Sequence, residues 1–371
     1  MNNLLYEERL LVLCSRVTFD SEIEKSLNNI LTQKLNWYRI VNLAIRNRVL
    51  GLVWKNLIEY GHRKSIPRRI QEVVELYFNA NTERNKVLLE ECSSVLNLLK
   101  KNDVIGVPLK GAFITENVFG DIGSRIMSDI DIMISTKDKE KVVEIIKERG
   151  YAQGDYNFDT NKIDPISRER QLKWKFGVKN IYPLRKITGN HFCKEISIDF
   201  CFGLEGDETN QIVDDMLVSV EFNEKYKCYM ISNECFFIHL CNHLYKEAKN
   251  ATWIVFEKEI NLLKFCDVRE YIFKFLRSED NLSNAIKYAI KHKQVEALYF
   301  TLYYLNIIFN DGYEEKVMSE LQMHLLDTES INTFGEKDYG EKITWKKSFW
   351  DRIFTFDNSD ELEKTPKFLL S

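Results

Sequence analysis

The sequence predicts an α+β protein: a small mixed sheet with helices, flanked by helical N- and C-terminal regions. Both ends show helical periodicity with few glycines, and the middle holds short segments in which apolar and polar residues alternate. A chain of 371 residues exceeds the usual single domain, so we expect several structural units. We predict a helical region over 1–102, an α/β core over 103–231, a second helical region over 232–310 and a partly ordered tail over 311–371.

The two helical regions are predicted from spacing and capping residues. In the first, apolar residues recur at turn spacing, for example at Leu88, Cys92 and Val95. In the second, Ser232 is a suitable N-cap for a helix, and further helices are expected to about Phe309. The last segment has several aromatic residues but no clear periodicity, so we assign it no elements.

The core is predicted to begin with a strand, a helix, a strand and a helix. Around Val104, VIGVPL is a short apolar run with Gly and Pro, and KGAFITENVF returns to a helical pattern. After the next strand, residues Lys137–Arg149 form an amphipathic helix that Gly150 is well placed to end. The alternation of strands and helices places a sheet at the centre of this region.

Two strands of the core carry carboxylates. SDIDIMIS alternates strictly, which predicts a half-buried strand with Asp129 and Asp131 on its open face and isoleucines on the other. EISIDFCF alternates in the same way, so Asp199 lies in the middle of a later strand on its polar face. Three carboxylates are therefore expected on the polar side of the sheet.

The segment from Tyr151 to His191 has weak periodicity, which predicts hairpins or a flexible insertion. Residues 168–186 are strongly basic. Two interpretations stay open for this run: a solvated insertion, or a segment that reaches an anionic acceptor or phosphate from between the two catalytic strands. Lys173, Lys175 and His191 are the candidate substrate contacts here.

Composition excludes several classes of protein. The net charge of −4 gives no global field that favours nucleic acid, so a nucleic-acid partner is disfavoured and any anionic ligand must be met by a local basic cluster. The eight cysteines have no paired spacing and are interpreted as buried free thiols. The N-terminus does not resemble a signal peptide, and the most apolar window, 297–309, is too short to span a bilayer, so we expect a cytoplasmic protein without a membrane partner. Frequent Lys, Asn and Ile favour an AT-rich bacterial source.

The paired aspartates predict a metal site. Two Asp residues two positions apart on a strand project the same way, and their repulsion is offset when a divalent cation lies between them. A third carboxylate, Asp199, would complete a site for two ions of the kind that nucleotidyl transfer requires. Hard carboxylate ligands without a Cys or His cluster favour Mg²⁺, with Mn²⁺ as the alternative. A DxD pair alone is often only a solvated surface feature, but here Lys110 and Arg125 precede it and supply cations for phosphate.

Two histidines, His239 and His243, stand one turn apart in the predicted helix after Ser232. Such a pair could bind zinc, but the sequence offers no evident third ligand and the helix is strongly apolar. We therefore favour a packing role for both, and keep them as secondary candidates for substrate contact.

The stretch VPLKGAFITENVFGDIGSRIMSDIDIMIS resembles the signature of the uncharacterised nucleotidyltransferase family of the polymerase-beta superfamily: KG, then R, then DID. Roughly Tyr6 to Tyr271 share this resemblance. The third carboxylate motif departs from the family, since DFCF replaces the frequent DLHW and puts Cys201 in the place of the histidine. KG also stands where the wider superfamily has GS or GG. The resemblance implies a polymerase-beta-type nucleotidyltransferase core. It implies metal ligands at Asp129, Asp131 and Asp199, and phosphate contacts at Lys110, Gly111, Arg125 and Ser128.

By the same resemblance the chain is expected to be a transferase that uses two Mg²⁺ ions. It would move a nucleoside monophosphate from an NTP to a hydroxyl or phosphate of an acceptor, with a small molecule or peptide favoured over RNA. Asp199 would be the activating base, and the flanking helical regions would set specificity. Three alternatives stay open: a nucleotide-sugar donor for glycosyl transfer, a catalytically silent nucleotide-binding or protein-interaction module, and nucleic-acid binding without catalysis, which the negative net charge disfavours.

Overall fold

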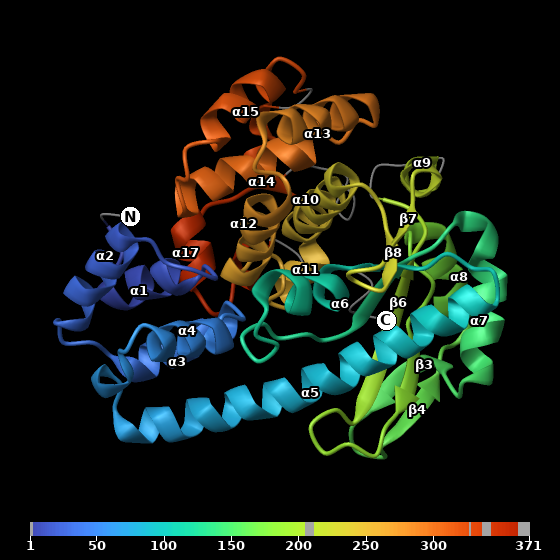
Figure 1. Ribbon diagram of the computed structural model, residues 1–371, viewed down its shortest axis with the longest axis horizontal. Helices are drawn as coiled ribbons and strands as arrows, with labels where there is room; N and C mark the ends of the chain where they lie inside the picture. Colours follow the sequence, from blue (N-terminus) through green and yellow to red (C-terminus); the bar gives the residue numbers. More distant parts are fainter. Residues whose placement is uncertain (1–2, 205–210, 326–327, 336–342, 363–371) are drawn as a thin grey trace. The chain divides into compact units, whose positions relative to one another are not determined.

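The computed structural model describes residues 3–204, 211–325, 328–335 and 343–362, except for the side chains of 173, 175–177, 279 and 328. The chain forms two compact units (Figure 1). The sheet unit comprises residues 78–236, and the helical unit comprises residues 1–77 together with 237–371. The four-part division expected from the sequence remains a prediction.

The helical unit is built from both ends of the chain. Its N-terminal elements are α1 (Tyr6–Cys14), α2 (Ser21–Leu31), α3 (Trp37–Arg46), α4 (Leu50–Glu59), η1 (Arg63–Ser65) and the beginning of α5 (Arg68–Lys101). Its C-terminal elements are most of α10 (Asn233–Lys249), α11 (Ala251–Val255), α12 (Leu262–Phe275), α13 (Glu279–Lys291), α14 (Val295–Ile308), α15 (Glu314–Gln322), η4 (Thr328–Ile331), β9 (Thr333–Phe334), β10 (Ile343–Thr344), α17 (Phe349–Phe354) and η5 (Ser359–Glu361).

Buried polar contacts join the two ends of the chain inside the helical unit. The guanidinium of Arg46 forms an ion pair of 3.0 Å with Glu259, and both side chains are almost completely buried. Asn47 donates from Nδ2 to the carbonyl of Ile353 and accepts at Oδ1 from the backbone N–H of Leu262. Since a buried polar group that loses its partner is costly, these contacts fix the pairing of the N- and C-terminal segments.

The sheet unit contains the remaining elements. After α5 come β1 (Val107–Leu109), α6 (Lys110–Ile114), the π-helix η2 (Thr115–Phe119), β2 (Ile130–Met133), η3 (Thr136–Asp138), α7 (Lys139–Glu148), β3 (Ala152–Asn157), β4 (Lys162–Pro165), α8 (Arg168–Gly177), β5 (Leu184–Ile187), β6 (Glu195–Cys201), α9 (Gln211–Val218), β7 (Glu221–Asn223) and β8 (Cys228–Met230).

The main sheet has six strands in the order β1-β2-β6-β5-β3-β4. Strands β2 and β6 run parallel, and the other neighbours are antiparallel. The sheet is therefore mixed, and together with the helical unit it confirms the predicted α+β class. The predicted strand, helix, strand, helix order from β1 to α7 is also confirmed.

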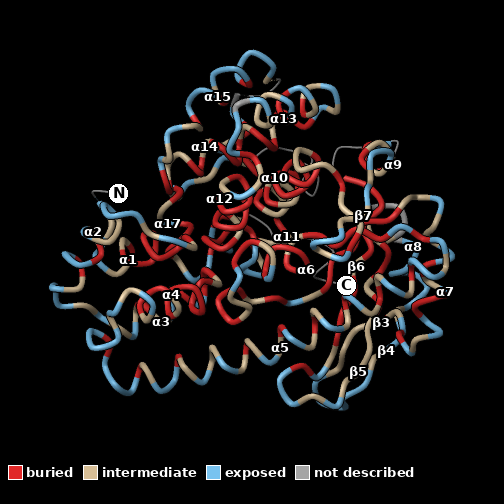
Figure 2. Tube along the Cα trace, viewed as in Figure 1, coloured by how far each residue is buried: buried red, intermediate tan, exposed pale blue. Residues whose placement is uncertain are grey.

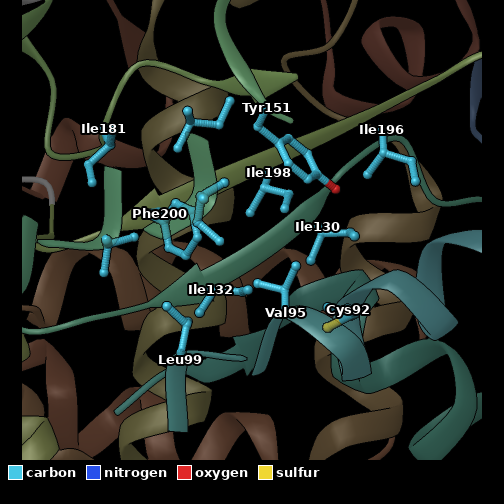
Figure 3. Packing of buried hydrophobic residues seen from close by; sticks show 14 of the residues in the cluster. Cys92, Val95, Leu99, Ile130, Ile132, Tyr151, Ile181, Ile196, Ile198 and Phe200 are labelled. Carbon is cyan, nitrogen blue, oxygen red and sulfur yellow. The ribbon is translucent and has the colours of Figure 1, made fainter. Parts of the chain in front are cut away.

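One face of the sheet carries the hydrophobic core. The isoleucines at alternate positions of β2 and β6 pack against the apolar side of α5, and Figure 3 shows Cys92, Val95 and Leu99 directed at Ile130 and Ile132. Exposed and buried stretches alternate along α5, as its spacing predicted (Figure 2). Because side chains alternate across a strand, the carboxylates point to the opposite face.

The structure corrects two predictions and adds elements to a region that had been given none. Residues 168–177 of the basic run form the helix α8, which was not predicted, although β3 and β4 form an expected hairpin. The region after residue 311 contains α15 and α17, to which the sequence analysis assigned no elements. Strand β2 is buried at every position instead of half-buried, because β1 and β6 flank it and both of its faces are covered.

The cap and cysteine predictions are confirmed. The hydroxyl of Ser232 accepts a hydrogen bond from the backbone N–H of Cys235 at the start of α10. All eight cysteines are free and buried. Within the described part of the chain, no helix is both long and apolar enough to cross a membrane.

Candidate metal centre

Two neighbouring parallel strands bring the three aspartates together. In the register of β2 and β6, Asp131 stands directly beside Asp199, and Asp129 precedes β2 by one residue. One carboxylate oxygen from each residue lies within 4.8 Å of the other two. Among the described residues, these three form the one group of three or more carboxylate, imidazole or thiol ligands close enough to share a metal ion.

The environment of Asp199 disfavours its negative charge. Burial raises the pKa of Asp199, and the negative charges of Asp129 and Asp131 raise it further, to about 8. The positive charges of Lys110 and Arg185 oppose this rise. Its Oδ1 atom is buried, and no described residue donates a hydrogen bond to it. An oxygen ligand in this state fits a divalent cation, which would satisfy the buried acceptor and offset the repulsion between the carboxylates.

Lys110 forms an ion pair with one of the three carboxylates. Its ammonium Nζ lies 2.6 Å from Oδ1 of Asp131, since β1 pairs with β2 and Leu109 is opposite Asp131. The backbone of Lys110 has a φ of +42°, a left-handed conformation that costs free energy in a non-glycine residue. This strained turn from β1 into α6 directs the side chain into the site.

Arg125 lies against the beginning of α6. Its guanidinium donates hydrogen bonds to Oγ1 of Thr115 and to the carbonyl of Ile126, and the residue is only 7% exposed. A Cβ atom added at Gly111 would lie 2.8 Å from Nη1 of Arg125. The KG motif and Arg125 are thus coupled: glycine is needed at position 111 because the guanidinium occupies the space of a side chain.

We expect Gly111→Ala to weaken nucleotide binding about tenfold or more, because the displaced guanidinium loses a charge-assisted hydrogen bond to phosphate. The unfolding free energy should fall by about 1 kcal/mol or more, because Nη1 of Arg125 must leave its buried hydrogen bonds to Thr115 and Ile126. Titration of NTP in the presence of Mg²⁺ measures the effect. Gly189→Ala is the matched control, because a Cβ there meets nothing within 4 Å; equal affinities for both variants would contradict the prediction.

The other sequence candidates have diverse surroundings. The hydroxyl of Ser128 lies 3.3 Å from Oδ1 of Asp129, beside the carboxylates. His191 is exposed in the loop between β5 and β6. Lys173 and Lys175 belong to α8, but their side chains lie outside the described residues.

The two histidines of α10 belong to the helical unit and are not members of the carboxylate group. His239 is 5% exposed, in agreement with a packing role. Nε2 of His243 lies 3.3 Å from Oε2 of Glu247, which also forms an ion pair of 2.6 Å with Lys264. His239 is thus buried within the helical unit, and His243 contacts an acid of its own helix.

Two asparagines of α5 support the site and were not predicted. Nδ2 of Asn81 donates to the carbonyl of Gly123, and Nδ2 of Asn85 donates to the carbonyls of Ile122 and Arg125. Both asparagines are buried. They hold the loop that leads from η2 to Asp129, and their spacing of four residues in an otherwise amphipathic helix was the available signal.

A family described as an uncharacterised nucleotidyltransferase matches residues 33–310, which is more than half of the chain. The chain belongs to this family. No curated protein and no solved structure matches the chain. Membership confirms the resemblance seen in the motifs, and it implies transferase activity and a nucleotide substrate.

Proposed function

We propose that this nucleotidyltransferase family member has a polymerase-beta-type core and transfers a nucleoside monophosphate from an NTP to a hydroxyl or phosphate of an acceptor with the help of Mg²⁺ or Mn²⁺. The observation that carries the proposal is the set of three carboxylates, from adjacent parallel strands, within 4.8 Å of one another. Lys110 and Arg125, on the β1 side of these carboxylates, supply the cations that a triphosphate needs.

Each residue has a role in this chemistry. Asp129, Asp131 and Asp199 would hold two divalent ions. When bound, these ions would lower the pKa of the attacking hydroxyl and offset the negative charge of the phosphates. Lys110 would leave Asp131 for a phosphate oxygen, since the ions then neutralise that carboxylate. In the transfer the acceptor oxygen bonds to the α-phosphorus, the bond from phosphorus to the bridging oxygen breaks, and pyrophosphate leaves with that electron pair. The proton of the hydroxyl passes to Asp199.

The proposal is tested by replacing Asp129 and Asp131 together with asparagine. We expect Mg²⁺-dependent transfer of α-labelled nucleotide to acceptors in a cell extract to fall by about 10³-fold or more, because the ions lose two ligands. Asp103→Asn is the control, since Asp103 is an exposed carboxylate of the same unit. All four NTPs and a set of nucleotide sugars are tested as donors.

Each outcome points to a different conclusion. Transfer from NTP that the double variant loses and the control keeps supports the proposal. Transfer of sugar from a nucleotide sugar would replace it with glycosyl transfer, and metal-dependent nucleotide binding without any transfer would replace it with a silent binding module. Absence of nucleotide binding by the unaltered protein would contradict all three.

A further inference from the structure

Arg185 lies beside the carboxylates on the side away from Lys110. Strand β5 pairs with β6 on the edge opposite to β2, and Arg185 stands directly across from Ser197. Residues two apart on a strand share a face, so Ser197 and Asp199 point to the same side of the sheet, and Arg185 points there too. The influence of Arg185 on the pKa of Asp199 agrees with this proximity.

The guanidinium of Arg185 is hydrogen-bonded through Nη1, whereas its Nε and Nη2 donors have no hydrogen-bond acceptor among the described residues. Nη1 donates to both carboxylate oxygens of Glu195, at 3.3 and 3.1 Å. Nη2 is 4.0 Å from Oδ1 of Asp155, which is too far for a hydrogen bond. Nε is buried and has no acceptor among the residues that the structure describes.

This edge is suited to an anion. Nε and Nη2 are parallel donors in the planar fork that binds both oxygens of a carboxylate or phosphate. A buried N–H without an acceptor costs free energy, and an anion oxygen that accepts from Nε would offset this cost. Glu195 fixes the guanidinium in advance, which lowers the entropy lost when the anion binds.

The position of Arg185 assigns it to the acceptor side. In an in-line transfer the attacking and leaving oxygens lie on opposite sides of the α-phosphorus. Lys110 and Arg125 are on the β1 side of the carboxylates, where the proposed function puts the triphosphate. Asp199, the proposed base, stands between these cations and Arg185, so a group bound by Arg185 would be adjacent to the attacking hydroxyl.

We infer that Arg185 binds an anionic group, a phosphate or a carboxylate, that the acceptor carries next to its accepting hydroxyl. The inference rests on the proposed function and names the chemical class of its acceptor. A purely structural role is the competing interpretation, because the pair formed by Arg185 and Glu195 also links β5 to β6. The two roles differ in whether a free anion binds at Arg185.

The test measures binding of inorganic phosphate, and separately of acetate, to the full chain saturated with Mg²⁺ and an α,β-methylene NTP analogue. The analogue fills the triphosphate position, so the added anion reports a second site. We expect saturable binding that weakens about tenfold or more in Arg185→Gln and in Arg185→Lys, because lysine keeps the charge but lacks the fork. The matched control is Lys186→Gln: Lys186 is the next residue of β5, and it contacts Glu91 at 3.5 Å on the other face.

The results separate this inference from the function on which it rests. Preference for phosphate or for acetate identifies the anionic group of the acceptor. Unchanged anion affinity in Arg185→Lys, or equal losses in Lys186→Gln, would overturn the inference. If the analogue and Mg²⁺ bind but neither anion does, the inference is wrong and the proposed function stands; if the analogue itself does not bind, the proposed function fails first. Circular dichroism and the unfolding midpoint verify that each variant is folded.

Discussion

Asp199→Asn is expected to lower the rate of metal-dependent nucleotidyl transfer by about 10³-fold or more, the size of effect associated with loss of a general base. The substitution keeps the shape of the side chain, so strand β6 and its pairing with β2 should persist. It removes both a proton acceptor and a negatively charged metal ligand. The rate of label transfer at saturating NTP and Mg²⁺ measures the effect, with Asp103→Asn as the control.

The same variant should be more stable than the unaltered chain in the absence of divalent ions at neutral to alkaline pH. Burial and like charges raise the pKa of Asp199 to about 8, well above the ordinary value of 3.8 that it has when unfolded. Between these pKa values the folded chain binds a proton that the unfolded chain does not. The unfolding free energy of the unaltered chain therefore falls as pH rises through this window, and asparagine removes this contribution.

Added Mg²⁺ should reverse the order of stability. A cation between the carboxylates replaces the proton on Asp199, so its binding releases a proton and its affinity rises with pH toward 8. Unfolding curves at several pH values, with EDTA or with Mg²⁺, separate the two effects. The unfolding free energies of the unaltered chain and of Asp199→Asn are compared without metal between pH 4 and 8. If both had the same pH dependence, the titration of Asp199 would not be the cause of the loss of stability with rising pH.

The local pattern predicted the elements of the core well, because period-two alternation reports directly on which side chains share a face. The alternation in SDIDIMIS and EISIDFCF placed Asp129, Asp131 and Asp199 on polar faces. Their grouping depends on β2 and β6 being parallel neighbours. That pairing is a long-range property, and it became predictable only through the resemblance of the KG, R and DID motifs to a family.

Burial and helix α8 were mispredicted for physical reasons. Asp131 is 5% exposed because flanking strands and packed elements cover β2, and no local pattern reports that coverage. In α8 only Leu172 and Phe176 have helical spacing, and one such pair in a short, strongly basic segment is a weak signal for a helix. The contact of Trp174 Nε1 with the carbonyl of Asn180, and its ring packing on Tyr182, support the helix from outside.

The ion pair of Lys110 with Asp131 could not be predicted from the sequence, which indicated only a phosphate contact for Lys110. In the proposed function, metal ions take the place of Lys110 beside Asp131, and a phosphate oxygen takes the place of Asp131 beside Lys110. The position of Arg185 near Asp199 could not be predicted from the sequence either. It depends on the pairing of β5 with β6 and on the hydrogen bond from Nη1 to Glu195.

Asn85→Ala is expected to lower the unfolding free energy of the sheet unit by roughly 3 kcal/mol, because it leaves several buried backbone groups without partners. Asn85 is 0% exposed. Its Nδ2 lies 2.6 Å from the carbonyls of Ile122 and Arg125, and its Oδ1 accepts from the backbone N–H of Met127 at 3.3 Å. These bonds tie α5 to the segment that carries Arg125 and leads to Asp129.

Asn79→Ala is the matched control, since Asn79 is an exposed asparagine on the same helix. Alanine has the higher helix propensity, so this variant should gain up to about 0.5 kcal/mol while Asn85→Ala loses stability. Urea unfolding measures both, and hydrogen exchange of the β2 amides assigns the loss to the sheet unit. Asn85→Ala should also weaken Mg²⁺-dependent nucleotide binding, because a looser loop leaves Arg125 and Asp129 less well positioned. A loss of stability with unchanged nucleotide affinity would mean that the asparagine supports the fold but not the site.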